Sequence, residues 1–193
     1  TARSRGLGDV YKRQSITNIL LLPAVIGGFI VAIITIRKKE WAPITVPIYG
    51  VLQGIFLGII SNVFNAMYDG IVITAISYTL CILFALLSVY RLGIIKPTEN
   101  FKLGLAAATG GIAIVYLANF IMSFFGSGIP LMDINNSSMY SIGFSVFVIV
   151  IASMNLVVDF DFIEEGAEKG APKYMEWYGA FGLMVTLVWL YLE

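Results

Sequence analysis

The sequence predicts an all-α integral membrane protein, a bundle of transmembrane helices. Of the 193 residues 59% are hydrophobic and only 12% are charged, and the mean hydropathy is +0.88. Soluble domains are roughly 45–50% apolar and about 25% charged. The apolar residues form long continuous runs, close to the roughly 20 residues that cross a bilayer. Strands of a membrane barrel would be about ten residues long and would alternate polar with apolar residues, so helices are expected.

Six such runs follow one another with short connections, and we expect them to form one transmembrane domain over residues 15–193. The expected spans are residues 16–36, 44–68, 70–90, 103–125, 140–158 and 176–193. Residues 1–14 are set aside, because the string TARSRGLGDVYKRQ is similar to a translated assembly or adapter scar and is expected to be non-native. The last span stops at Glu193 without a polar flank. The chain is therefore expected to be a fragment of a longer protein that lacks both the native N-terminal and the native C-terminal part.

The basic residues of the connections predict the orientation of the spans, because short loops rich in lysine and arginine stay in the cytoplasm. They follow the first, third and fifth spans only: Arg37, Lys38, Lys39, Arg91, Lys96, Lys102, Lys169 and Lys173. The other two connections carry Asp69 and Asp133 and no basic residue. The three basic connections are predicted to be cytoplasmic and the other two to face outside.

The second span carries two features of interest. Gly50, Gly54 and Gly58 recur every four residues, which leaves one helix face without side chains and predicts close helix packing. Asn62 and Asn65 follow in the same span, and polar groups in an apolar helix need partners inside the bundle. These asparagines are expected to make interhelical hydrogen bonds, or alternatively to line an aqueous path.

The connection before the fourth span reads GIIKPTENF. Thr98 follows a proline and precedes Glu99, a pattern that is typical of a helix start with a threonine cap and an acid in the first turn. The fourth helix is expected to begin near Thr98.

The acidic residues concentrate at the end of the fifth span, in the string NLVVDFDFIEEGAEKGAPKYMEWY. Asn155 and Asp159 are four residues apart and share a helix face, whereas Asp161 turns to the other side. Glu193 follows an apolar run without a break and is expected to need a partner, either Asp159 through a shared proton or cation, or Arg37. Carboxylates at a membrane edge are desolvated and repel one another, which suits a proton switch or a cation site. The alternative is a solvated acidic loop.

Several classes of function are excluded or disfavoured. A net charge of zero excludes a nucleic-acid footprint, and the absence of histidine excludes a histidine-based metal or proton site. Cys81 lies in an apolar run and is expected to be a small buried residue. No cofactor is expected and no metal site is assigned. An intramembrane protease could use two acids on adjacent helices, but residues 15–193 contain no GxGD motif, so the chain is not expected to be an enzyme.

Four stretches carry a family resemblance: YGVLQGIFLGIISNVF, YDGIVITA, YRLGIIKPTENF and NLVVDFDFIEEGAEKGAPKYMEWYGAFGLMVTLVWLYLE. They resemble the bacterial Bax inhibitor-1-like family, and the likeness covers about residues 20–193. The family has seven transmembrane helices and a cytoplasmic N-terminus. The resemblance therefore implies that six helices are visible here and that the first helix of the family is missing. The orientation predicted from the basic connections agrees.

The resemblance also implies a function, a pH-sensitive calcium leak channel in the bacterial inner membrane. By position, the paired sensor acids are Asp159 and Glu193, with glutamate here where better-known members have aspartate, and Arg37 is the candidate latch. Asn62, Asn65, Asn155 and Asp161 could line a polar path. The expected partners are the lipid bilayer, calcium or protons, and other membrane proteins. The alternative is a protein without transport activity that binds and regulates other membrane proteins.

Overall fold

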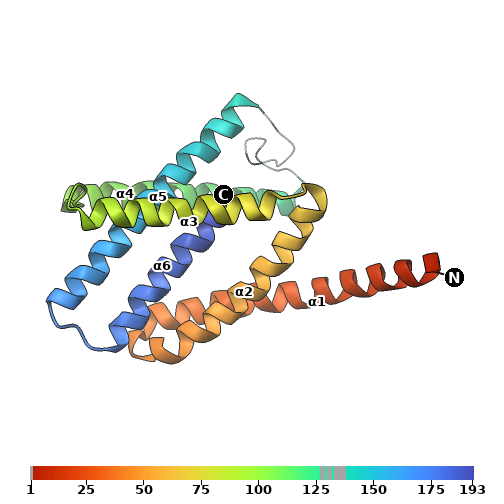
Figure 1. The fold of residues 1–193 in the computed structure, drawn as a ribbon, viewed down its shortest axis with the longest axis horizontal. Helices are drawn as coiled ribbons and strands as arrows, with labels where there is room; N and C mark the ends of the chain where they lie inside the picture. Colours follow the sequence, from red (N-terminus) through yellow and green to blue (C-terminus); the bar gives the residue numbers. More distant parts are fainter. Residues whose placement is uncertain (1, 127–128, 130–131, 133–137) are drawn as a thin grey trace. The chain divides into compact units, whose positions relative to one another are not determined.

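The computed structural model describes residues 2–126, 129, 132 and 138–193, with side chains from residue 20 onward (Figure 1). The helices are α1 (Ala2–Arg37), the 3-10 helix η1 (Lys39–Trp41), α2 (Ala42–Met67), α3 (Ile71–Arg91), α4 (Glu99–Phe124), α5 (Met139–Glu168) and α6 (Tyr174–Leu192). Over the described residues the chain has no strand and has six helices long and apolar enough to cross a membrane, which confirms the predicted fold class. Asp133, predicted to face outside, lies outside the described residues.

Helix α5 continues ten residues beyond the predicted span, which ends at residue 158. The acidic stretch that follows contains good helix formers and no proline, so the helix continues to Glu168. It stops where Gly170 adopts φ 63°, a left-handed conformation that commonly ends helices. Asp159 and Asp161 therefore lie on a helix, and their directions are fixed by its turn.

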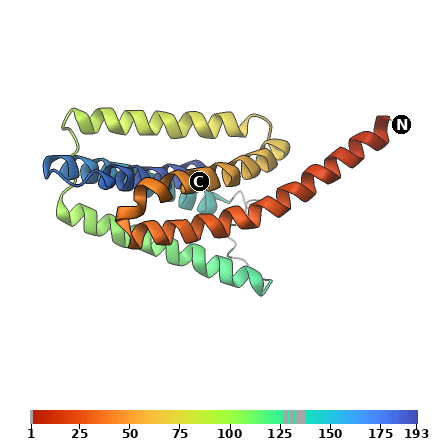
Figure 2. The ribbon, with the colours of Figure 1, turned by 90° about the horizontal axis from the view of Figure 1, so that it is seen from below.

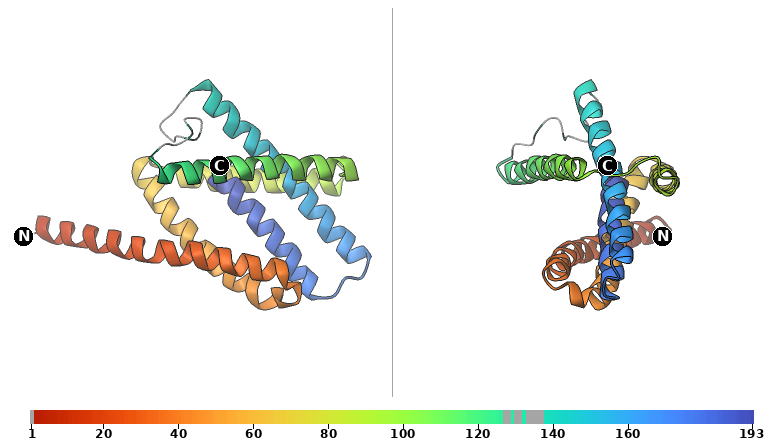
Figure 3. Two further views of the ribbon diagram at one scale, coloured as in Figure 1. Left: turned by 180° about the vertical axis from the view of Figure 1, so that it is seen from behind. Right: turned by 90° about the vertical axis from the view of Figure 1, so that its left-hand side faces the viewer.

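The chain divides into two compact units. The first contains Thr1–Ile76 and Lys169–Met184, and the second contains Ser77–Glu168 and Val185–Glu193. In the first unit α1 and α2 run side by side in opposite directions, joined through η1 (Figures 2 and 3). In the second unit α5 lies between α3 and α4 (Figures 2 and 3).

The core of the first unit forms where α2 meets the first half of α6. Ala42, Val46, Tyr49 and Phe181 are buried together, and the rings of Tyr49 and Phe181 meet edge to face with centroids 5.0 Å apart. In contrast, many large apolar side chains on the outer helix faces are exposed, among them Ile73 at 72%. Such faces suit contact with lipid.

The glycine face of α2 is in close contact at one of its three positions. A Cβ atom at Gly50 would lie 3.5 Å from Cε of Met184, so the missing side chain makes room for this methionine. At Gly54 and Gly58 no atom lies within 4 Å of that position, and packing there remains a prediction. A closer approach is at Gly27 of α1, where a Cβ atom would lie 3.4 Å from Leu52.

A hydroxyl pair joins α1 to α2 inside the first unit. Thr35 is fully buried, and its Oγ1 lies 2.7 Å from Oγ1 of Thr45 and 2.8 Å from the carbonyl oxygen of Val31. In a membrane such interhelical hydrogen bonds supply much of the specificity of helix packing, because lipid is as apolar as the helix surfaces.

Replacing Thr35 with valine, which keeps the shape and removes the hydroxyl, is expected to lower the free energy of unfolding by about 1 kcal/mol. Unfolding in mixed detergent micelles measures the loss. The control is Ser88→Ala, because the Ser88 hydroxyl bonds only to a carbonyl of its own helix, that of Phe84. Equal stability of the two variants would contradict the role of the threonine pair.

Helix α4 begins as predicted. The Thr98 side chain caps it by accepting a hydrogen bond from the backbone N–H of Phe101 at 3.3 Å, and Glu99 occupies the first turn. This cap fixes where α4 begins, and with it the positions of Lys102, Thr109 and Tyr116 along the helix.

Candidate functional site

Asp159 lies on the side of α5 that faces the end of α6. The hydroxyl of Thr186 donates a hydrogen bond of 2.6 Å to Oδ2 of Asp159. Thr186 is buried, and so are Leu156 and Val157, the apolar residues just before Asp159 on α5. The carboxyl group is therefore held in largely apolar surroundings by a neutral hydroxyl.

Glu193 is held in a similar way by another helix. The phenol of Tyr116, on α4, donates a hydrogen bond to Oε2 of Glu193. In the part of the chain that the structure describes, neither Glu193 nor Asp159 forms an ion pair. Both acids named from the resemblance thus have hydroxyl partners.

The two acids lie at different levels of the second unit. Thr186 lies on α6 and Glu193 is the residue directly after α6. They are seven residues apart, which is about 10 Å along the helix axis. Asp159 accepts a hydrogen bond from Thr186, whereas Glu193 accepts one from Tyr116. The shared proton or cation considered from the sequence would require these hydroxyl contacts to be given up.

Asn155 lies between the two levels. It is one turn before Asp159 on α5, and its Nδ2 donates to Oγ1 of Thr109 on α4 at 2.9 Å and to the carbonyl of Ile151 at 2.9 Å. Three polar pairs therefore follow one another inside the second unit. We refer to these pairs, Asp159 with Thr186, Asn155 with Thr109, and Glu193 with Tyr116, as the polar line.

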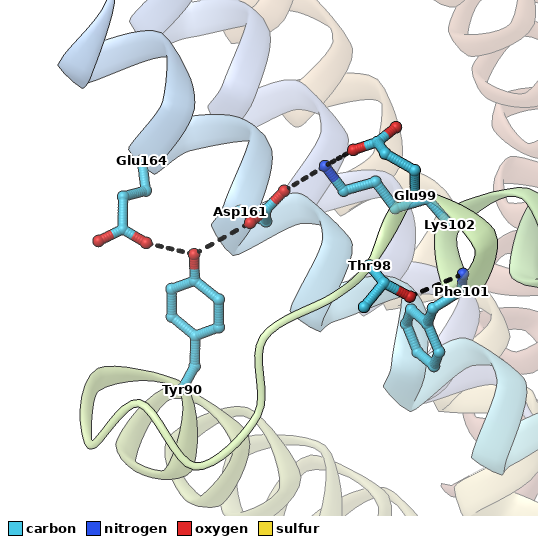
Figure 4. Close-up of polar contacts among 7 residues, drawn as sticks. All are labelled: Tyr90, Thr98, Glu99, Phe101, Lys102, Asp161 and Glu164. Carbon is cyan, nitrogen blue, oxygen red and sulfur yellow. Dashed lines mark hydrogen bonds and ion pairs between the residues drawn. The ribbon is translucent and has the colours of Figure 1, made fainter.

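Asp161 belongs to a separate group of contacts, which we call the Lys102 cluster (Figure 4). Nζ of Lys102 lies 2.6 Å from Oδ2 of Asp161 and 3.0 Å from Oε1 of Glu99. The Tyr90 hydroxyl, from α3, donates to Glu164 and lies 3.5 Å from Oδ1 of Asp161. The end of α3, the start of α4 and the end of α5 thus meet at one end of the unit, as the predicted topology requires.

The acids of this cluster are occupied by the lysine and the tyrosine. Among the described residues no group of three or more acidic, cysteine or histidine side chains is placed to hold a metal ion.

Helix α5 is held on two sides by acids only two residues apart. Two residues turn a helix by about 200°, so Asp159 and Asp161 point to nearly opposite sides. Asp159 connects α5 to α6, whereas Asp161 connects it to α3 and α4. A change of charge at either acid alters the balance of contacts on α5.

Arg37, the predicted latch, is the exposed last residue of α1 and belongs to the first unit. In the described part of the chain its side chain makes no hydrogen bond or ion pair. The next two basic residues lie over aromatic rings, Lys38 at 4.4 Å from the Trp41 centroid and Lys39 at 4.9 Å from the Tyr178 centroid. The latch role of Arg37 remains a prediction.

The asparagines of α2 are exposed near its end. Asn65 accepts a hydrogen bond of 3.3 Å from the backbone N–H of Gly70, in the turn that leads to α3. Asn62 is exposed as well. A polar path along these two residues remains a prediction. Interior polar contacts of α2 are instead made by Thr45, with Thr35, and by Gln53, whose Nε2 lies 2.8 Å from the Tyr49 hydroxyl.

The partners of the acids were not predicted from the sequence. No role was expected for Tyr116, Thr109 or Thr186, and Lys102 was expected only to be a basic residue of a connection. One signal was available, since Lys102, Thr109 and Tyr116 are seven residues apart in an otherwise apolar helix and therefore share a face. Thr186 is a lone threonine in an apolar run, and nothing in the sequence pairs it with Asp159.

A comparison with protein families gives a match to the family described as Bax inhibitor 1 like, over residues 7–193. Comparisons with curated proteins and with solved structures give no match. The matched range includes residues 7–14, part of the segment set aside from the sequence, and the non-native origin of that segment remains a prediction. The match covers nearly the whole chain, and six helices can cross a membrane. The chain is therefore an integral membrane protein of the Bax inhibitor 1-like family.

Proposed function

We propose that the protein is a pH-sensitive leak channel for cations, with calcium as the transported ion, and that Asp159 and Glu193 are its proton sensors. The observation that carries the proposal is that both carboxyl groups lie inside an apolar helix bundle and have neutral hydroxyls as partners. Acids inside membrane-spanning segments are costly and usually mark ion or proton pathways.

The hydroxyl partners make a change of protonation practicable. A carboxylate in an ion pair must give up that pair to become neutral, whereas a carboxylate bound to a hydroxyl need not. A hydroxyl can donate to the ionised carboxylate, and it can turn to accept from the protonated one. Thr186 and Tyr116 can therefore stay in contact with Asp159 and Glu193 in both charge states.

Protonation of both acids removes two negative charges from the polar line. This weakens the attraction of the line for a cation and changes the hydrogen bonds that join α5 and α6 to their neighbours. In this proposal the change opens or closes the path, and Arg37 acts as the latch that responds to the charge of the acids. The protein is proposed to lie in the inner membrane. The ligands of its site are proposed to be protons and calcium ions.

The test is calcium flux into liposomes that contain the purified protein, measured against pH. The double variant Asp159→Asn with Glu193→Gln is expected to lose the dependence of flux on pH, because neither amide titrates. The control is Glu168→Gln, which removes an exposed acid at the end of α5 and should keep the wild-type pH profile. A double variant with the wild-type pH profile would refute the sensor assignment.

The alternative function is a membrane protein that binds and regulates other membrane proteins without transporting ions. Purified protein alone distinguishes the two functions, because a regulator without transport activity gives no flux above that of empty liposomes at any pH.

A further inference from the structure

Helix α4 presents one polar side chain every seven residues on a single face. These residues are Lys102, Thr109 and Tyr116, and seven residues make nearly two helical turns. Leu105 and Ile112 lie between them and are buried, at 6% and 4% exposure. The face that carries the three polar residues is therefore a packed face.

Each of the three residues binds a different partner from α5 or α6. Lys102 forms an ion pair with Asp161 at 2.6 Å, and Thr109 accepts from Asn155 at 2.9 Å. Tyr116 donates to Glu193. We call these three contacts the α4 seam. From Lys102 to Tyr116 the seam extends about 21 Å along α4, most of the roughly 30 Å of a bilayer core.

The seam uses the groups that a cation path would need. A cation that crosses the bundle replaces its water with oxygen atoms of side chains and backbone. The oxygens of Asp161, Thr109 and Glu193 are the ones that the seam pairs with groups of the protein itself. While α4 is in contact with α5 and α6, each of these oxygens faces its partner group of the protein and not an ion.

Apolar contacts do not hold these helices together as they would in water, because lipid tails are as apolar as the side chains that they replace. Ion pairs and hydrogen bonds between helices therefore decide which faces meet. The α4 seam supplies such a contact at three levels of the second unit.

We propose that the α4 seam is the contact that closes the leak channel. Ions pass when α4 separates from α5 and the end of α6. Tyr116 is a positioning residue that holds Glu193 in the closed state. This proposal rests on the proposed function. It differs from the latch assigned to Arg37, because every residue of the seam belongs to the second unit.

Removing the ion pair tests the first level of the seam. Lys102→Met is expected to raise calcium flux at neutral pH about tenfold, because the closed state loses its charged contact. Lys102→Arg keeps the charge and should raise the flux by less than Lys102→Met does. Lys96→Met is the matched control, since Lys96 is exposed in the connection before α4. Flux of Lys102→Met at the wild-type level would contradict the proposal.

Cross-linking tests the middle level. Cys81 is exposed, so the prediction that it is buried is wrong, and Cys81→Ser removes this native thiol. Thr109→Cys with Asn155→Cys in that background allows a short reducible bis-thiol reagent to join α4 to α5. Mass spectrometry establishes the cross-link. Flux is expected to fall at least tenfold at every pH when the link is present and to return after reduction. Cross-linked protein that leaks as much as the reduced protein would overturn the proposal.

Tyr116→Phe tests the positioning role. The ionised form of Glu193 loses its donor, so the pH at which flux is half-maximal should move upward while the melting temperature stays near the wild-type value. An unchanged pH profile would contradict the role of Tyr116. Failure of the proposed function is recognised separately, because the Cys81→Ser protein without the two engineered cysteines would then give no flux at any pH.

Discussion

Replacing Thr186 with valine is expected to raise the pH at which calcium flux switches and to destabilise the protein at neutral pH. Valine has nearly the shape of threonine but cannot donate the 2.6 Å hydrogen bond that Asp159 receives. Thr186 is buried, so water does not readily replace its hydroxyl. An ionised carboxylate without this donor loses a strong, charge-assisted hydrogen bond, whereas a protonated carboxyl group loses only a weaker, neutral one.

The expected loss in the free energy of unfolding is about 1–3 kcal/mol at a pH where Asp159 is ionised, the usual range for a buried polar group left without its partner. The loss should become smaller as the pH falls and Asp159 takes up a proton. Stability in detergent measured against pH, together with flux in liposomes, follows both effects. The variant and the wild type should differ most at high pH and converge in acid.

Two further variants make the Thr186 prediction specific. Thr186→Ser keeps the hydroxyl and is expected to behave like the wild type. Thr74→Val is the matched control, because the Thr74 hydroxyl is exposed and bonds to the carbonyl of Gly70 in its own chain segment, at 3.1 Å. If Thr186→Val and Thr74→Val show the same pH profile, the contact between Thr186 and Asp159 has no part in proton sensing.

The transmembrane helices were predictable because each is a local property of the sequence. A long apolar run must form a helix to satisfy its backbone in lipid, and the start of α4 is encoded within three residues by Thr98 and Glu99. The end of α5 was less predictable. Charged residues suggested a loop after residue 158, yet glutamate is a good helix former and the helix continues to Glu168.

The contacts of the candidate site depend on how neighbouring helices are rotated and shifted against one another. Asp159 and Glu193 were found from their place in apolar runs and from a family resemblance, but the sequence does not tell which hydroxyl each one meets. Apolar runs with little amphipathic pattern give no preferred face, so the partner Tyr116 had to come from the structure. The seven-residue spacing on α4 was a signal that could have been used.

Each single acid variant, Asp159→Asn or Glu193→Gln, is expected to keep a pH response, with a midpoint near one of the wild-type transitions. The reason is that the two carboxyl groups have separate partners, and the residues of α6 that mark their levels are about 10 Å apart along the helix. Two acids that shared one proton would titrate as a coupled pair, and loss of one would shift the transition of the other by more than about one pH unit.

Flux measured at closely spaced pH values tests this expectation. The wild-type profile should fit two protonation steps, and each single variant should fit one, with a slope that falls from about two protons to about one. The amide side chains of Asn and Gln still accept the hydrogen bonds from Thr186 and Tyr116, so the helix contacts are kept. A single variant that abolishes the whole pH response, or moves the remaining midpoint by more than about one unit, would instead establish a coupled pair. In that case the hydroxyl contacts described here belong to only one of the states through which the protein passes, because a shared proton requires both carboxyl groups to leave their separate partners.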